Sequence, residues 1–266
     1  MIDKAFILTH ESDFPYLTGC IKSLSGVVKK VYLGDTDIES KSLETLYPIL
    51  GLYKSYFKEV KVIYLGQTSN FAEARNKMLE YANEGEWILQ IDSDERVVVE
   101  DSRWVKEFGV DGEEGYRVKV SGPHMQKDGR VVNLEEWIFR VFKYRNGIKY
   151  KFRVHEQIGH EFVGRGVKEL KGLRIVHLGY DIPKGLMDKK VRRNEELILK
   201  ELLLGGVHSY MLYHLGEMRL WQGDIISALR CYRRALERCE ITNPELIKRV
   251  EEKVKVLEKR VGGRNE

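Results

Sequence analysis

The chain has 266 residues, of which 42% are hydrophobic and 32% charged, and its formal net charge is +4. This composition is typical of a folded chain with a substantial core, and the charge is too small to indicate nucleic-acid binding. No stretch approaches the roughly 18 apolar residues of a membrane span, and the first residues do not resemble a secretory signal, so we expect a cytoplasmic protein.

The first ninety residues alternate between strand and helix patterns. Apolar runs predict strands over 5–8, 31–33, 60–65 and 87–91, and helical spacing predicts helices over 17–24, 42–57 and 71–83, the second interrupted near Pro48. Such alternation indicates right-handed crossovers and a mainly parallel sheet. Because ligands bind at the carboxyl ends of parallel strands, the loops that begin at Thr9, Gly34, Gly66 and Asp92 should converge on one cleft.

The fourth predicted strand, Trp87 to Ile91, runs directly into an acidic cluster. Asp92 and Asp94 are two residues apart, so in an extended segment both carboxylates point to the same side and can hold one hard cation with its phosphates. An acidic turn without a ligand fits these residues as well. The sequence has no Gly-x-Gly-x-x-Gly and no Gly-Lys-Ser/Thr motif, which argues against a nicotinamide or P-loop nucleotide fold.

After Val99 the pattern changes to shorter strands, predicted over 116–120, 137–144, 148–154 and 173–177. The pair Asn146-Gly147 between two of them predicts an antiparallel hairpin, since both central residues of its turn need positive φ. Six basic residues with no acid between them occur from Arg140 to Arg153. This run indicates a solvated strand face, or a surface for a phosphate-bearing acceptor or an anionic membrane.

From Lys184 onward the spacing is helical, with a long amphipathic stretch over 191–204. Asn243 and Pro244 predict the start of a last helix that ends near Val261. One helix-turn-helix repeat of the tetratricopeptide kind is indicated by small and aromatic residues at Leu215, Gly216, Gly223, Ala228, Tyr232 and Ala235. A single repeat cannot bury its face alone, so it should stack on neighbouring helices or on a second subunit.

Five short motifs occur in order: Asn70 to Asn76, Trp87 to Glu95, Arg140 to Lys143, Val154 to Glu156, and His177 to Tyr180. Together they resemble the family 2 glycosyltransferases of GT-A fold, and they are most similar to the branch with tetratricopeptide-like helices after the catalytic domain. The resemblance implies an α/β fold over residues 1–183, in which a mainly parallel sheet has a smaller antiparallel part. An α-helical domain over residues 184–266 should follow.

The resemblance also implies transfer of a sugar from a nucleotide diphosphate, usually a uridine one, with Mn²⁺ or Mg²⁺ and with inversion. Asp94, assisted by Asp92, would hold the cation that stabilises the departing diphosphate, so Asp94 would also be catalytic. His177 is in a position where the fold supplies a further metal or diphosphate ligand, although a structural histidine also fits. Tyr180 would stack on the donor or be buried.

Donor-binding roles follow from the same resemblance. Either Asp35 or Asp37 would hydrogen-bond the uracil or ribose; the loop is shorter than the family's, so the choice between them stays open. Arg75 would approach the base and diphosphate, or form a helix-surface ion pair. Three further donor-binding candidates lie in the loops at the strand ends, namely Thr9, Glu11 and Ser93.

Inverting transfer also needs a general base for the acceptor, and Glu156 is the candidate, with Glu135, Glu136 and Asp181 as competitors. The acceptor, a glycan, lipid, peptide or small molecule, is not indicated. The sequence leaves open a peripheral contact with the inner membrane surface, and a homo-oligomer or protein partner bound by the helical tail.

Two other functions use similar features: a sugar nucleotidyltransferase and a non-catalytic sugar-nucleotide-binding scaffold. The first should have a glycine-rich basic loop after the first strand, but Thr9 to Phe14 contains neither glycine nor lysine. Intact Asp92, Asp94 and Arg75 argue against the second.

Overall fold

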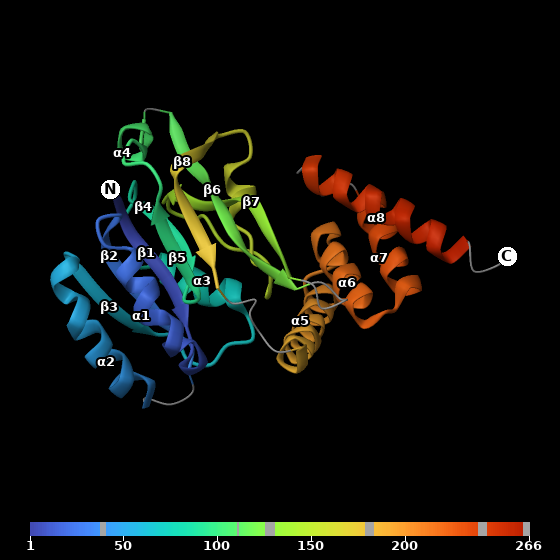
Figure 1. The fold of residues 1–266 in the computed structure, drawn as a ribbon, viewed down its shortest axis with the longest axis horizontal. Helices are drawn as coiled ribbons and strands as arrows, with labels where there is room; N and C mark the ends of the chain where they lie inside the picture. The colour runs from blue at the N-terminus through green and yellow to red at the C-terminus, as the bar shows by residue number, and fades with distance from the viewer. Residues whose placement is uncertain (38–40, 111, 126–130, 179–183, 239–243, 263–266) are drawn as a thin grey trace. The chain divides into compact units, whose positions relative to one another are not determined.

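We describe the chain from a computed structural model, which covers residues 1–37, 41–110, 112–125, 131–178, 184–238 and 244–262. The chain divides into two compact units, Met1–Asp181 and Ile182–Glu266. The first contains an eight-stranded sheet with helices, and the second is helical, so the predicted fold class is confirmed (Figure 1).

Four parallel strands form one half of the sheet, in the order β3-β2-β1-β4. They coincide with the four apolar runs of the first ninety residues, because a strand covered on both faces needs apolar side chains at successive positions. In β1, for example, Ala5 and Ile7 belong to one buried cluster and Phe6 to the other. The bounds are β1 Ile2–Thr9, β2 Val28–Asp35, β3 Glu59–Tyr64 and β4 Trp87–Asp92.

The other half continues from β4 in the order β7-β6-β8-β5, with antiparallel pairing except between β6 and β8. Only Ser93 and Asp94 separate β4 from β5, yet three strands lie between β4 and β5 in the sheet order. The sheet must therefore curl until its last strand returns to the end of β4. The bounds are β5 Glu95–Val99, β6 Glu113–Met125, β7 Val131–Lys143 and β8 Gly166–His177.

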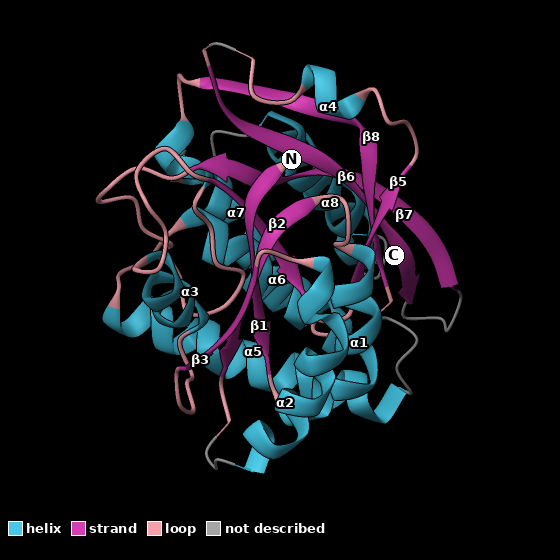
Figure 2. Cartoon of the chain, turned by 90° about the vertical axis from the view of Figure 1, so that its left-hand side faces the viewer, coloured by secondary structure: helices cyan, strands magenta, loops and turns pink. Residues whose placement is uncertain are grey.

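Helices cover both faces of the parallel half. Apolar side chains of α1, α2 and α4 join the larger buried cluster, whereas those of α3 join the second cluster on the opposite face (Figure 2). Short 3-10 segments, Glu11–Asp13, Lys54–Tyr56 and Gly159–Phe162, occur between the longer elements. The helix bounds are α1 Phe14–Ser23, α2 Lys41–Tyr53, α3 Phe71–Leu79 and α4 Trp104–Glu107.

Three local predictions are wrong. The strands after Val99 are not generally shorter, since β6, β7 and β8 have 13, 13 and 12 residues. The segment 148–154 is not a strand: after a turn in which Gly147 has φ 91°, the only pairing within it is a single bridge between Lys151 and Gln157. The predicted hairpin is therefore absent from this described segment. The helix predicted to be interrupted near Pro48 continues through it to Tyr53, although proline removes one hydrogen bond of the helix.

The second unit consists of helices with their own buried cluster. Gly216 lets α6 approach α7 closely, since a Cβ at this position would lie 2.5 Å from the ring of Tyr232. The helix-capping prediction for Asn243 falls outside the described residues. No helix in the described part of the chain is long and apolar enough to span a membrane. The bounds are α5 Lys184–Leu204, α6 Ser209–Gln222, α7 Ile225–Glu237 and α8 Pro244–Gly262.

Candidate active site

The loops at the carboxyl ends of the strands are joined by backbone hydrogen bonds. Thr36 donates to the carbonyl of Thr9 from its amide and from its hydroxyl, both at 3.0 Å, which joins the ends of β1 and β2. The amide of Leu178 donates to the carbonyl of Asp94 at 2.9 Å, which joins the end of β8 to the acidic turn after β4. Residues far apart in the sequence therefore meet at this edge, as expected for a parallel sheet.

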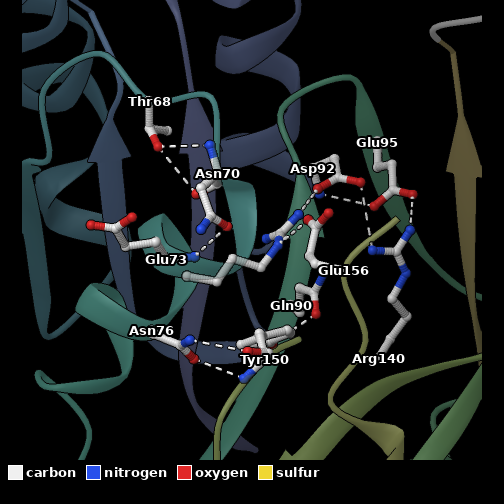
Figure 3. A network of polar contacts seen from close by, with 11 residues as sticks. Thr68, Asn70, Glu73, Asn76, Gln90, Asp92, Glu95, Arg140, Tyr150 and Glu156 are labelled. Carbon is white, nitrogen blue, oxygen red and sulfur yellow. Dashed lines mark hydrogen bonds and ion pairs between the residues drawn. The ribbon is translucent and has the colours of Figure 1, made fainter. Parts of the chain in front are cut away.

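A row of alternating charges crosses this edge (Figure 3). Glu156 Oε1 lies 2.5 Å from Arg75 Nε, and Arg75 Nη2 lies 2.7 Å from Asp92 Oδ1. On its other side, Asp92 Oδ2 lies 3.5 Å from Arg140 Nη1, and Arg140 Nη2 lies 2.6 Å from Glu95 Oε1. We call these five residues the charge row.

Two carboxylates of the charge row have shifted pKa values. Burial alone would raise the pKa of Asp92, but the positive charges of Arg75 and Arg140 outweigh it and hold this pKa well below its usual range. Burial raises the pKa of Glu95 to about 7, against the opposing charge of Arg140. Asp92 is therefore an anion held between two cations at the end of β4. Its side chain keeps 36% of its surface exposed, so it faces both the protein and solvent.

Arg75 is positioned by α3, whose N-terminus is capped by Asn70. The Asn70 side chain accepts the amide of Glu73 at 3.2 Å, which is the usual capping hydrogen bond of an asparagine at a helix start. The guanidinium of Arg75 also faces Gln90 on β4. With the Gln90 amide oxygen toward Arg75, at 3.2 Å from Nε, its nitrogen donates to the Tyr150 hydroxyl at 2.7 Å.

Glu156 is carried by a loop with unusual backbone angles. Phe152 and His155 have φ of 72° and 55°, a region that non-glycine residues rarely adopt. Backbone hydrogen bonds in both directions between Lys151 and Gln157, at 2.9 and 3.0 Å, close this loop at its base. Strain of this kind persists where the surroundings fix the backbone, and it is concentrated at functional sites.

Two of the three predicted metal ligands lie next to each other. His177 Nε2 is 3.3 Å from Asp94 Oδ2, and this contact raises the pKa of His177 against the lowering effect of burial. The carboxylate of Asp92 instead lies between its two arginines. Among the described residues, no three histidine, cysteine or acidic side chains gather as a set that could hold a metal. A cation here would therefore take two protein ligands and further oxygens from a bound diphosphate, a ligand set that suits Mn²⁺ or Mg²⁺.

A second group of polar atoms lies at the ends of β1 and β2. Asp35 is fully buried, and its Oδ1 accepts the amide of Asp37 at 3.1 Å, so it braces the loop. Asp37 Oδ1 lies 3.0 Å from His10 Nε2, whereas its buried Oδ2 has no hydrogen-bond partner among the described residues. The hydroxyl of Thr9, 1% exposed, likewise has none there. Buried oxygens without partners carry a free-energy cost that a ligand's donors would offset.

The remaining predicted residues have less distinctive surroundings. Glu11 is exposed beside this group, and Ser93 is buried in the turn before Asp94. Glu135 and Glu136 are on β7, where Glu135 lies 3.7 Å from Lys119. Tyr180 and Asp181 fall outside the described residues.

Sequence reasoning missed Arg140, Glu95 and His10. Arg140 belongs to the basic run that predicts a solvated strand face, or a surface for a phosphate-bearing acceptor or an anionic membrane. The solvated face is wrong for this residue, because its side chain is 11% exposed and is paired with acids. Glu95 is fully buried. Arg140 lies where the pairing of β6 with β7 shifts register, between the pairs Arg117–Phe139 and Tyr116–Val141, so alternation along the strand gives no signal of its burial.

The comparisons with known proteins agree with this architecture. No family model matches the chain. The chain is 26% identical over 181 residues to the SPbeta prophage-derived glycosyltransferase SunS of Bacillus subtilis strain 168, and to the glycosyltransferase SunS of Bacillus phage SPbeta. These alignments cover 65% of this chain but 40% of each relative, so the chain spans less than half the length of the curated relatives it matches.

Two solved structures are similar over nearly the whole chain. TarS of S. aureus has a TM-score of 0.52 at 14% identity, covering 97% of this chain and 52% of TarS. GalNAc-T7, solved with UDP, GalNAc and Mn²⁺, has a TM-score of 0.50 at 13% identity, covering 98% of this chain and 56% of its own. The fold of this chain is thus that of the GT-A glycosyltransferases. Its curated relatives are glycosyltransferases by name.

Proposed function

We propose that the chain is a metal-dependent glycosyltransferase of family 2, which transfers a sugar from a uridine diphosphate donor to an acceptor with inversion. The observation that carries this proposal is the pairing of Asp94 with His177 at the strand ends, next to the charge row. A diphosphate leaving group gains negative charge as the glycosidic bond breaks, and a cation there would offset this charge. Both the fold and the named relatives support this class of reaction.

In the proposed site, Asp94 and His177 would hold the cation, and Asp92 would keep Arg75 and Arg140 oriented toward the diphosphate. Arg75 has two acidic partners, and they raise its pKa against the lowering effect of burial, so it stays positively charged. We assign the nucleoside to the group of polar atoms at the ends of β1 and β2, where Thr9 Oγ1 and Asp37 Oδ2 are buried acceptors. This choice favours Asp37 over Asp35, because Asp35 is occupied in bracing the loop.

Inversion requires a base on the acceptor side, and we propose Glu156 for this role. It is fixed relative to Asp92 because both carboxylates bind Arg75. We propose that the helical unit is tetratricopeptide-like and that it binds the acceptor or a protein partner.

Calorimetric titration of the chain with UDP, with and without Mn²⁺, tests the proposal. We expect UDP binding that depends on the metal and is lost in Asp94→Ala, whose circular dichroism spectrum should be unchanged because Asp94 lies in a turn. Equal UDP binding by Asp94→Ala and the unaltered chain would contradict the site assignment. A panel of sugar nucleotides then identifies the donor by UDP release. Pyrophosphate release from a nucleoside triphosphate and a sugar 1-phosphate would instead indicate a nucleotidyltransferase.

A further inference from the structure

The side chain of Arg96 connects α1 to the turn that carries Asp94. Its Nη1 donates to the carbonyl of Ser93 at 3.2 Å and to that of Glu95 at 2.7 Å. Its Nη2 donates to the carbonyl of Tyr16 in α1 at 2.6 Å. The two residues on either side of Asp94 are thus fastened to the helix through a single guanidinium.

A glycine in α1 makes room for this guanidinium. A Cβ at Gly19 would lie 2.5 Å from Arg96 Nε, 2.6 Å from Nη2 and 2.8 Å from Cζ. Glycine inside a helix is destabilising by about 1 kcal/mol relative to alanine, so its presence at this position has a cost. The Arg96 guanidinium packs against the helix backbone at Gly19, and this packing explains why a glycine is present there despite the cost.

Two further contacts fasten the same stretch to α1. Cys20 Sγ donates to the carbonyl of Asp92 at 3.4 Å, and Ser23 Oγ accepts the amide of Val97 at 3.0 Å. On the side away from α1, the amide of Leu178 holds the Asp94 carbonyl. The backbone of Asp94 therefore lies between α1 and the end of β8, the strand that supplies His177.

We propose that Arg96 is a positioning residue, which fixes the position of Asp94 for binding the metal and the diphosphate. Gly19 leaves the space that the Arg96 guanidinium occupies. This inference rests on the proposed function, since it assigns to Asp94 the role of cation ligand. Arg96 touches backbone carbonyls and acts only through the turn. Misplacing a ligand by about 1 Å is enough to cost on the order of 100-fold in a site that depends on geometry.

Gly19→Ala is the test, and Gly51→Ala is its matched control. Both glycines are inside helices, but a Cβ at Gly51 meets nothing within 4 Å. The atoms that Gly19→Ala displaces are the far end of a flexible side chain, so the fold should survive. We expect Gly19→Ala to weaken Mn²⁺-dependent UDP binding by about 10-fold to 100-fold, and Gly51→Ala to leave it unchanged.

Arg96→Met gives an independent reading, because it removes the donors and leaves the helix intact. It should weaken UDP binding as much as Gly19→Ala does. Adding Gly19→Ala to Arg96→Met should then cause no further loss, since the methyl group no longer displaces a guanidinium; this non-additivity is what contact between the two positions requires. Additive losses in the double variant would mean that Gly19 acts independently of Arg96.

The outcomes separate this inference from the proposed function. If the unaltered chain shows no metal-dependent UDP binding, the proposed function fails first. If the unaltered chain does show it, but Gly19→Ala and Arg96→Met bind Mn²⁺ and UDP as tightly as the unaltered chain does, Arg96 is not a positioning residue. Thermal melting of each variant identifies any loss that comes from unfolding.

Discussion

Glu156 has a proposed catalytic role and also a structural contact, and an experiment must distinguish the two. Its carboxylate accepts Arg75 Nε at 2.5 Å, so it is a structural partner of the charge row as well as the proposed base. Glu156→Gln keeps an oxygen that can accept this hydrogen bond but cannot take up the acceptor proton. We expect kcat to fall by about 10²–10⁴-fold while UDP affinity is retained.

The measurement is UDP release from the donor that the panel identifies, with water as the acceptor until a better one is known. Glu135→Gln is the control, since Glu135 is a competing candidate whose side chain is 49% exposed on β7. A rate that falls in Glu135→Gln and is unchanged in Glu156→Gln would transfer the role of base to Glu135.

Sequence motifs identified individual members of the charge row but not the row itself. Arg75, Asp92 and Glu156 each belong to a recognisable motif, and the contacts among them form because α3, the end of β4 and one loop meet. Arg140 and Glu95 were missed because a buried ion pair leaves no local pattern. Their separation of 45 positions is closed by the pairing of β7 with β4, which brings Arg140 beside the end of β4.

At the scale of elements, the cap of α3 fixes the helix that carries Arg75. Asn70 accepts the amide of Glu73 through its side chain, which satisfies one of the four unpaired amides at the helix start. Asn70→Ala should lower the free energy of unfolding by about 1 kcal/mol, measured by urea denaturation. Asn70→Asp, which retains an accepting oxygen, should stay close to the unaltered chain. Equal stability of all three chains would mean that the cap is replaced by water.

In the parallel half, β1, β2 and β4 could be predicted because burial on both faces gives each one a run of apolar residues. The edge strand β3 is less buried and contains Lys61, but apolar residues on either side of it still indicate a strand. The segment 148–154 has an equally suggestive alternation, but its backbone finds another partner. The amide of Tyr150 donates to Asn76 Oδ1 at 2.7 Å and its carbonyl accepts Asn76 Nδ2 at 3.1 Å, so a side chain of α3 takes the place of a neighbouring strand. The alternation in the sequence reflects the burial of Ile148, Tyr150 and Val154. It does not indicate which groups form hydrogen bonds with the backbone of this segment.

At the scale of the whole molecule, each of the two units has a hydrophobic cluster of its own. In the helical unit, Tyr232 is fully buried against Gly216, and its hydroxyl donates to Glu217 Oε1 at 2.5 Å. Lys253 of α8 lies 2.8 Å from the same Glu217 oxygen. One tyrosine therefore joins three helices through packing and through a shared carboxylate.

Tyr232→Ala should consequently destabilise the helical unit by about 3–5 kcal/mol, the range for truncating a buried aromatic side chain. The loss should be visible as a lower midpoint in thermal denaturation followed by far-ultraviolet circular dichroism. Because the proposed UDP site is built from residues of the first unit alone, UDP binding at a temperature below that midpoint should be retained. Trp104→Ala, which truncates a side chain 2% exposed in the core of the first unit, is the control and should weaken UDP binding. Loss of UDP binding in a folded Tyr232→Ala chain would require the helical unit to contribute to the donor site.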